Sequence, residues 1–452
     1  MNIIIAGNGK VGVTLVKELC EEGHDLTMID VEKKLVDGTQ EQFDVMGVTG
    51  NCASMPTLLT AGVEKADLLI AATNADEINL LCCLTAHGLN SKIHTIARVR
   101  NPEYTDQIYA MRDLFALSLT VNPEKQAATE IGRLMKFPGF LRRDTFAKGM
   151  TEIVELRVER GSKLCDVSLI DMYKIVKCQV LVCTVLRDGK AIAPGGNFVL
   201  KEGDRIFVTA PTKSLTVLLR NLGIITRKVR DVILCGGDRI SRYLAQMLLK
   251  EGISVKIIEK DPVRCRDLGE QLEGVEIVQG DCSSKSFLLS EGLGSCDALV
   301  ALTGMDEMNM IISLYAKSQG VPQVITKLGR GENMEMADDL ELGSVICPRE
   351  LCSNNIVRYV RAMQKQTGAA VSVHSIADGK AEAVEFLVDE STQNCGIPLK
   401  ELKLKPGVLL VSITRGKNTE IPNGSSSFDV GDTVVVVTTG KKVLHQLGDI
   451  FA

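Results

Sequence analysis

Met1-Asn2-Ile3-Ile4-Ile5-Ala6-Gly7-Asn8-Gly9-Lys10-Val11-Gly12 is the stretch of sequence that decides the fold. A short apolar strand enters a G-x-G-x-x-G turn, and the residues after it repeat their apolar side chains at the spacing of a helix. Gly7 permits the tight bend, Gly9 lets the backbone approach a pyrophosphate, and Gly12 allows the helix to pack closely. The amides at the helix start supply positive potential for phosphates. The predicted binding positions in this turn are Gly7, Asn8, Gly9, Lys10, Val11 and Gly12.

Polar residues at the ends of three further strands complete this predicted site. Asp30 follows the turn and ends the second expected strand, where a carboxylate can accept both ribose hydroxyls. It would repel a 2′-phosphate, which favours NAD or an adenine nucleotide over NADP. Thr73, Asn74 and Arg98 end the fourth and fifth strands, at the edge where open α/β sheets bind ligands. Arg98 has the planar fork of donors that suits a phosphate.

A structural interpretation of the same residues stays open. A fold of this kind can carry such side chains on its surface and bind nothing. Asn51, after the third expected strand, is a weaker candidate because Asn or Asp at a strand end is often only a helix cap.

The chain contains an internal repeat, which determines how it divides. The strand Ile3–Gly7 returns as Val232–Gly236, and Asp30 returns as Glu259 at the same offset along the chain. Other pairs recur at nearly that offset, namely Asn51 with Asp281, Thr73 with Thr303 and Gly203-Asp204 with Gly431-Asp432. Two copies of one unit therefore account for the whole length.

Each copy changes character part way along. The first alternates apolar strands with helices, the strands at 2–6, 26–30, 45–48, 68–71 and 93–98 and the helices at 10–22, 32–42, 54–61 and 76–88. Such a βαβ series predicts a parallel sheet. A further helix at 123–136 leads through 137–139 into a strand-rich section, with strands at 152–158, 179–187 and 205–209. The second copy repeats this plan, with a helix near 354–364 and strands at 383–388, 408–414 and 433–438.

The sequence thus predicts an α/β protein with two doubly wound, parallel-sheet Rossmann domains, each followed by a small α+β domain. The expected domains are residues 1–136, including a crossover helix, then 140–225, 229–366 and 368–452, with the middle boundary near 226–230.

The second copy keeps the fold pattern but loses part of the chemistry. In its turn the close-approach glycine is Asp238 and the packing glycine is Ser241. A carboxylate that faces a pyrophosphate is unfavourable, although Arg239 could compensate. Both nucleotide binding and a purely structural copy stay open for this cleft. Its candidate binding residues are Gly236, Gly237, Asp238, Arg239, Ile240, Glu259 and Asp281.

Composition excludes several classes of protein. Among 452 residues the net charge is -5, Trp is absent and aromatic residues make up 4%, which argues against nucleic-acid binding. No apolar run approaches the ~18 residues of a membrane span, and the start of the chain has no basic leader, so we expect a cytoplasmic protein. The fourteen Cys have no C-x-x-C spacing and the five His no ligand-spaced pair, so no metal site is predicted.

Binding without turnover fits the sequence better than catalysis. A dehydrogenase normally adds a catalytic domain with a His, a Lys or a Tyr-Lys pair, whereas only a small α+β section follows each Rossmann unit here. Cys82 and Cys83 lie among leucines and are interpreted as core. We predict no catalytic residues. The alternative is an NAD-dependent oxidoreductase with a dispersed active site.

The chain resembles the TrkA family of tandem RCK (KTN) proteins, regulatory subunits of bacterial and archaeal Trk potassium uptake systems. The resemblance rests on Gly7–Gly12, Asp30 and the stretches 66–80 and 96–104. Residues 347–351 and 356–361 resemble the family's second crossover helix, and Gly203-Asp204 and Gly431-Asp432 resemble positions of RCK C-terminal domains.

The resemblance implies a cytosolic regulator that assembles into a ring, expected to be a homotetramer, beneath a membrane K⁺ channel of the TrkH/TrkG type. It also implies that NAD(H) and ATP or ADP bind in the Rossmann units and change the ring's shape to gate the pore. The implied binding positions are Gly7 through Val11, Asp30, Thr73, Asn74 and Arg98. Some RCK C-terminal domains bind a cyclic dinucleotide, but residues 152–221 and 383–452 supply no decisive motif for one.

Overall fold

The computed structural model describes residues 1–136, 139–224, 228–330, 333, 336–337, 340, 342–363, 370–377, 379–439, 444 and 446–452. Several sequence predictions fall outside these residues. They concern 137–138 of the expected linker, 225–227 around the middle boundary, 364 at the end of the second crossover helix, and the expected domain limits at 366 and 368.

Internal contacts divide the chain into two compact units. The first unit holds Met1–Ala128 and Cys347–Val357, and the second holds Thr129–Ile346 and Arg358–Ala452. One six-stranded sheet lies in the first unit, and one six-stranded and two five-stranded sheets lie in the second. This is the predicted fold class of two parallel-sheet units and two smaller sheet domains.

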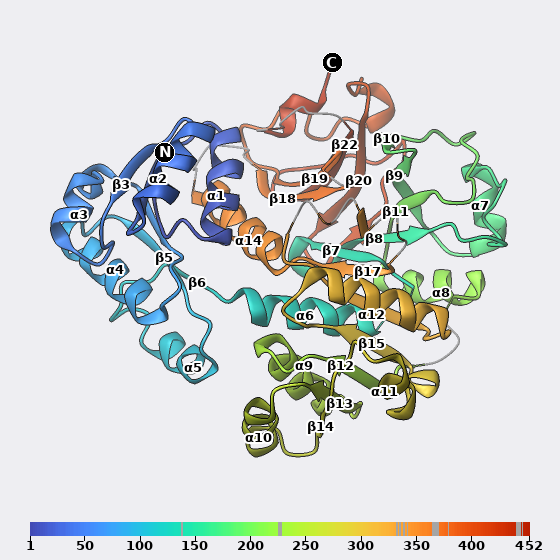
Figure 1. The fold of residues 1–452 in the computed structure, drawn as a ribbon. Helices are drawn as coiled ribbons and strands as arrows, with labels where there is room; N and C mark the ends of the chain where they lie inside the picture. The colour runs from blue at the N-terminus through green and yellow to red at the C-terminus, as the bar shows by residue number, and fades with distance from the viewer. Residues whose placement is uncertain are drawn as a thin grey trace. The chain divides into compact units, whose positions relative to one another are not determined.

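The sheet of the first unit, drawn in blue in Figure 1, is parallel and has the strand order β3-β2-β1-β4-β5-β6. Its strands are β1 (Asn2–Ala6), β2 (Asp25–Asp30), β3 (Met46–Thr49), β4 (Leu68–Ala71), β5 (His94–Arg98) and β6 (Leu119–Val121). The helices between them are α1 (Lys10–Glu21), α2 (Lys33–Gln42), α3 (Met55–Thr60), η1 (Val63–Lys65), α4 (Asp76–Leu89) and α5 (Pro102–Ala110). The strand order reverses between β1 and β4, so a ligand crevice is expected at their carboxyl ends.

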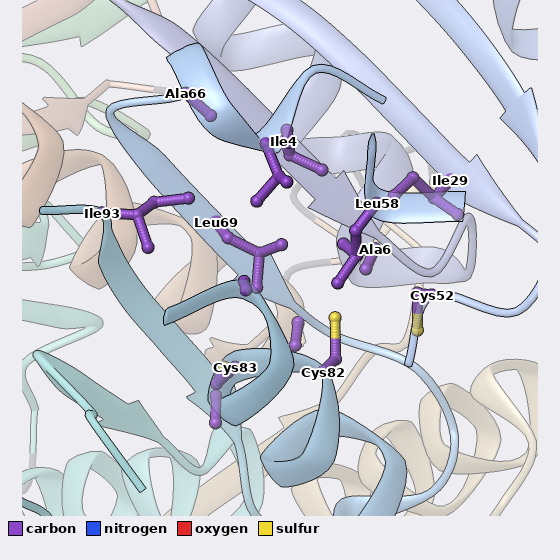
Figure 2. Close-up of a cluster of buried hydrophobic side chains, with 14 of the residues drawn as sticks. Ile4, Ala6, Ile29, Cys52, Leu58, Ala66, Leu69, Cys82, Cys83 and Ile93 are labelled. Carbon is purple, nitrogen blue, oxygen red and sulfur yellow. The ribbon is translucent and has the colours of Figure 1, made fainter. Parts of the chain in front are cut away.

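Both faces of this sheet are buried. Ile4, Ala6, Leu69 and Ala71 point into one apolar cluster with residues of α3 and α4. The alternate strand residues are buried on the other face, as the continuous burial of β1 and β4 requires. Figure 2 shows Cys82 and Cys83 of α4 within this cluster, which is the core position expected from the sequence.

The parallel sheet of the second unit repeats the first, with the order β14-β13-β12-β15-β16-β17. Ala6 pairs with Ile29 in the first sheet, and Cys235 pairs with Ile258 at the same place in the second. The strands are β12 (Asp231–Cys235), β13 (Ser254–Glu259), β14 (Glu276–Gln279), β15 (Ala298–Ala301), β16 (Gln323–Lys327) and β17 (Ser344–Ile346). The helices are α9 (Arg239–Lys250), α10 (Pro262–Gln271), α11 (Lys285–Ser290), η3 (Leu293–Ser295) and α12 (Asp306–Ser318).

The two small sheets are antiparallel and share one topology. The first has the order β10-β9-β11-β8-β7 and comprises β7 (Arg142–Phe146), β8 (Thr151–Arg157), β9 (Leu181–Arg187), β10 (Lys190–Ile192) and β11 (Arg205–Ala210), with η2 (Ala147–Gly149), α7 (Leu169–Val176) and α8 (Thr212–Leu222). The second has the order β18-β19-β22-β20-β21 and comprises β18 (Ala370–Ile376), β19 (Ala381–Leu387), β20 (Val408–Arg415), β21 (Asn418–Glu420) and β22 (Thr433–Thr439), with η4 (Leu399–Glu401) and η5 (Leu447–Ile450).

These small sheets pack against each other within the second unit. Phe146 and Phe207 of the first lie in one buried cluster with Val411 and Val435 of the second. Polar contacts join the same sheets, including Asp144 Oδ1 to His374 Nδ1 at 2.9 Å and Glu385 Oε1 to the Ala147 amide at 3.1 Å. The two copies therefore share a core through their small domains.

Two helices carry the chain from one unit to the other. α6 (Pro123–Lys136) starts in the first unit and belongs to the second from Thr129, and α14 (Pro348–Met363) starts in the first unit and belongs to the second from Arg358. In the second unit, the Leu134 carbonyl oxygen of α6 accepts a hydrogen bond from Gln323 Nε2 at 3.0 Å. In the first unit, Ser353 of α14 donates a hydrogen bond to Glu18 of α1. No helix among the described residues is long and apolar enough to span a membrane.

Candidate functional site

The glycines of the first turn are required by close backbone contacts. Gly7 has φ +103°, and a Cβ there would lie 2.8 Å from the Thr73 amide nitrogen. A Cβ at Gly12 would lie 2.0 Å from the Gly7 carbonyl oxygen. In the first copy the helix therefore packs this closely on the turn only with glycine at both places.

The start of α1 is open. Gly9 is the N-cap residue with φ −77° and ψ −174°, no side chain caps the helix, and a Cβ at Gly9 would meet nothing within 4 Å. Lys10 is exposed, and Val11 is buried, so Val11 offers a ligand only its backbone. The uncapped amides of α1 thus face open space, which suits an anion.

Asp30 is fixed beside this turn by two backbone amides. It accepts hydrogen bonds from Asn8 N at 2.6 Å and Glu32 N at 2.9 Å. The side chain of Asn8 points to α2 instead, where its Nδ2 donates to the Leu35 carbonyl at 2.6 Å and to Thr39 Oγ1 at 2.8 Å. Asn8 therefore contributes to the site through its backbone, while its side chain holds α2 in place.

A buried asparagine orders the ends of β4 and β5. Asn79 is fully buried; its Oδ1 accepts from Thr73 N at 2.8 Å and Thr73 Oγ1 at 2.7 Å, and its Nδ2 donates to the Arg98 carbonyl at 2.8 Å. Asn309 makes the same contacts with Thr303 and Lys327 in the second copy. This asparagine was not among the residues predicted for the site, although its recurrence as Asn309 in the repeat was a signal that could have found it.

We call the carboxyl ends of β1, β4 and β5, together with the start of α1, the first cleft. Arg98 is its buried cation. It is 8% exposed, and its Nη2 donates to the Thr73 carbonyl at 2.5 Å and to Asn74 Oδ1 at 3.4 Å. Its buried Nε has no hydrogen-bond partner among the described residues. Burial, and then the nearby Arg100, lower the pKa of Arg98. Within the described part of the chain no carboxylate forms an ion pair with Arg98, so a buried donor and its charge are left for an anion.

Asn51 stands apart from these contacts. It is exposed, and its Oδ1 accepts from Ala53 N at 3.0 Å in the turn that precedes α3. The N-cap residue of α3 is Ser54, so Asn51 shapes the turn before the helix and is not its cap.

The first cleft fits a nucleotide phosphate on these observations. The α1 amides and Arg98 would hold the phosphates, and Asp30 would accept from the ribose. A bound nucleotide would supply only negative charge and sugar hydroxyls, because a binding site requires no reaction of its ligand.

The second cleft has the same backbone and a different charge distribution. Gly236 has φ +110°, and Asp238 is the N-cap of α9 with φ −80° and ψ −177°. Asp238 Oδ1 accepts from Ser241 N at 3.1 Å, and Asp238 Oδ2 lies 2.6 Å from Lys327 Nζ. Arg239, expected as the compensating cation, is exposed; the cation that pairs with Asp238 is Lys327.

The acidic candidates Glu259 and Asp281 of the second cleft accept hydrogen bonds from the protein, as Asp30 does in the first. Glu259 accepts from the amides of Gly237 at 2.7 Å, Lys260 at 2.7 Å and Asp261 at 2.8 Å. Asp281 accepts from the Ser283 amide and from Lys260 Nζ, each at 2.9 Å, and these bonds lower its pKa to about 2. Ile240 is buried at 2% exposure.

Cys82 and Cys83 of α4 are poor nucleophiles. Burial raises the pKa of Cys83 to about 12, and the hydrogen bond with Cys52, followed by burial, raises the pKa of Cys82. A protonated, buried thiol is chemically inert.

Comparison with known proteins identifies both kinds of domain. The TrkA-N domain model matches residues 3–116 and 232–348, and the TrkA-C domain model matches 153–223 and 383–451. The chain is 33% identical over 451 residues to the Trk system potassium uptake protein TrkA homolog of Archaeoglobus fulgidus, covering all of both chains. It is 29% identical over 460 residues to the TrkA protein of Halomonas elongata, covering all of this chain and 98% of the relative.

Solved structures share the fold at lower identity. The GsuK RCK domain has a TM-score of 0.62 at 16% identity over 97% of this chain and 92% of its own. The GsuK channel bound to NAD has a TM-score of 0.60 at 17% identity, covering 97% and 76%. GsuK bound to ADP has a TM-score of 0.53 at 14% identity, covering 80% and 70%.

Proposed function

The chain belongs to the TrkA family, and from that membership we propose that it is a nucleotide-sensing regulatory subunit of a potassium uptake system. It acts on a membrane K⁺ channel of the TrkH/TrkG type, lies at the inner face of the cell membrane through that partner, and assembles into a homotetrameric ring. The curated relatives carry the name of this uptake system, which supports the role.

One observation carries the sensing role: the buried Arg98 and Gly7, in the turn that leads to the uncapped start of α1, both lie against Thr73. A buried guanidinium that forms no ion pair with a carboxylate among the described residues is costly, and an anion that reaches it offsets that cost. Because the α1 amides point to the same space, the preferred anion is a phosphate or pyrophosphate.

NAD(H) and ADP or ATP are the ligands proposed for this cleft. All of them carry a pyrophosphate next to a ribose with free hydroxyls, which matches Arg98, the α1 amides and Asp30. NADP is disfavoured because Asp30 would face its 2′-phosphate. A solved structure of this fold described as bound to NAD and another described as bound to ADP support the choice.

The route from nucleotide to channel runs through the two connecting helices. Glu124 in the first turn of α6 and Cys352 in α14 both lie close enough to Arg98 to influence its charge. Both helices continue into the second unit. A phosphate at Arg98 changes the charge that these helices face, and a ligand acts on a conformational equilibrium by such differential contacts.

We also propose that the chain binds nucleotides without turning them over, and that the domain limits are those expected from the sequence: 1–136, 140–225, 229–366 and 368–452. Sustained oxidation of NADH by the purified protein in the presence of a substrate would instead favour the oxidoreductase alternative.

Isothermal titration of the full chain with NADH, NAD⁺, ADP and ATP tests the site. We expect binding that Asp30→Ala weakens strongly, while Asp25→Ala, at the exposed opposite end of the same strand β2, leaves it unchanged. Equal binding by all three proteins, or none by the wild type, would reject the assignment.

A further inference from the structure

The two Rossmann clefts differ by a side chain on an unchanged backbone. The N-cap residues Gly9 and Asp238 have φ of −77° and −80° and ψ of −174° and −177°. Their positive-φ turns at Gly7 and Gly236 also match, with φ of +103° and +110°. The Asp238 side chain therefore enters the space that is open above Gly9, where a Cβ would meet nothing within 4 Å.

In that space the Asp238 carboxylate makes the contacts expected of a bound phosphate. One oxygen accepts from the amide of Ser241 in the first turn of α9, at 3.1 Å. The other lies 2.6 Å from Lys327 Nζ, which also donates to the Leu302 carbonyl at 3.0 Å. Helix amides and a cation are the usual donors to an anion at a helix start.

Lys327 stands where Arg98 stands in the first copy. Each is the last residue of its strand, β16 or β5, at the corresponding place in the repeat. Arg98 bonds to the carbonyl of Thr73 and lacks a carboxylate partner in the described chain, whereas Lys327 is paired. The positive charge that attracts a ligand to the first cleft is already neutralised in the second.

The ribose end of the second cleft differs from the first by an apolar side chain. Glu259 accepts from backbone amides as Asp30 does, but Leu268 stands where the first copy has Thr39, and it lies so close to the turn that a Cβ at Gly237 would be 2.5 Å from its Cδ1. Ser241 occupies the place of Gly12, where a Cβ in the first copy would clash at 2.0 Å, and its Oγ donates to the Gly236 carbonyl at 2.5 Å.

We propose that Asp238 is a built-in substitute for the nucleotide phosphate, with Lys327 as its counter-ion, so that the second cleft takes no dinucleotide and the chain binds one nucleotide through its first cleft. This inference rests on the proposed function only for the number of nucleotides bound, which is one per chain. The exclusion of a dinucleotide from the second cleft rests on the contacts of Asp238 and Lys327. An incoming pyrophosphate would have to displace Asp238 from both the helix amide and Lys327.

Titration calorimetry on the full chain with NADH tests the proposal in three proteins. The wild type is expected to bind one NADH per chain. Gly9→Asp, which gives the first cleft the second cleft's N-cap, is expected to weaken that binding by about a hundredfold or more because a carboxylate then faces the pyrophosphate. Both Asp and Gly are accepted N-caps, so this variant is expected to fold, as circular dichroism can check.

The third protein, Gly9→Asp/Asp238→Gly, opens the second cleft while the first is blocked. We expect it to bind inorganic pyrophosphate at least about tenfold more tightly than Gly9→Asp alone, because Lys327 and the α9 amides are released. Gly9→Asp/Asp231→Asn is the matched control, since it removes one negative charge at the opposite, exposed end of β12 and should show no gain.

The outcomes separate the two proposals. Binding of two NADH per wild-type chain, or of one NADH by Gly9→Asp, would overturn the proposal that Asp238 substitutes for a nucleotide phosphate. No gain of pyrophosphate binding on Asp238→Gly would overturn it as well. No NADH binding by the wild type together with that gain would reject the proposed function and leave the inference supported.

Discussion

A side-chain carbon at Gly12 would lie 2.0 Å from the carbonyl oxygen of Gly7, so the first turn of α1 rests directly on the nucleotide-binding loop. This contact sets the position of the helix amides relative to Asp30 and Arg98. It also means that the loop cannot accept a methyl group without moving.

Gly12→Ala is predicted to displace the start of α1 and to weaken nucleotide binding strongly. The added methyl group meets backbone, which cannot rotate away, so we also expect a loss of stability of about 1–3 kcal/mol. Calorimetry with NADH and thermal unfolding measure the two effects. Gly38→Ala is the control within the same sheet unit, because Gly38 lies in α2 with nothing within 4 Å; it should add about 0.5–1 kcal/mol of stability and leave binding unchanged. A Gly12→Ala protein that binds like the wild type would contradict the steric argument.

Arg98→Gln is predicted to weaken NADH and ADP binding about tenfold to a hundredfold, because a hydrogen bond to a charged group contributes about 1.5–3 kcal/mol. The wild type should also lose affinity more steeply with added salt than the variant does. Arg112→Gln, at a side chain that is 54% exposed, is the control and should match the wild type. Titrations at two salt concentrations decide the point, and unchanged affinity for Arg98→Gln would remove Arg98 from the site.

Glu130 in α6 is predicted to make stability depend on pH. Burial raises its pKa to about 7 against the opposing effect of Arg133, while Asp144 adds to the rise and Arg142 opposes it. The folded protein therefore holds this proton more tightly than the unfolded chain, so stability falls as pH rises from about 4.5 to about 7. Glu130→Gln should remove that fall, giving a higher Tm than the wild type at pH 8 and a similar one at pH 5. Parallel Tm curves for the two proteins would contradict the prediction.

The pair of Asp144 and His374 is predicted to hold the two small sheets together. Burial alone would raise the Asp144 pKa, but Arg142 and His374 outweigh it and lower the pKa to about 2. The stability from this carboxylate is thus present above about pH 4 and is lost as pH falls toward 2. Asp144→Asn should destabilise at pH 7, and a double-mutant cycle with His374→Gln should give a coupling of about 0.5–3 kcal/mol. Asp171→Asn, at an exposed ion pair with Lys174, should change stability by less than about 0.5 kcal/mol. Strictly additive effects of Asp144→Asn and His374→Gln would exclude a stabilising interaction between these two side chains.

The parallel sheets could be predicted from sequence because their signals are local. A buried parallel strand such as β4 is an unbroken apolar run, and the glycine turn that follows β1 has few other uses. The repeat then predicts the corresponding strands and helices in the second copy.

Elements with mixed polarity escaped prediction. β7, with the sequence Arg142-Arg143-Asp144-Thr145-Phe146, has no apolar alternation, because its charges are paired across the small sheets, Arg143 with Glu152 and Asp144 with His374. α5 and β6 lie in a stretch with no clear period. α14 begins at Pro348 rather than near Asn354.

Long-range pairing in the second cleft was also beyond the sequence. Arg239 is adjacent to Asp238 in the chain and was the natural compensating cation, but as the first residue of α9 it points to solvent. Lys327 is far from Asp238 in the chain and reaches it only because β16 lies two strands from β12 in the folded sheet.

If a nucleotide in the first cleft controls potassium uptake, K⁺ uptake by cells that lack the gene for this chain will show it. Such cells are complemented with the wild type, with Gly9→Asp, or with Asp25→Ala, at matched protein levels. We predict that the wild type and Asp25→Ala restore regulated uptake and that Gly9→Asp, folded but unable to bind nucleotide, does not. Full restoration by Gly9→Asp would contradict the account.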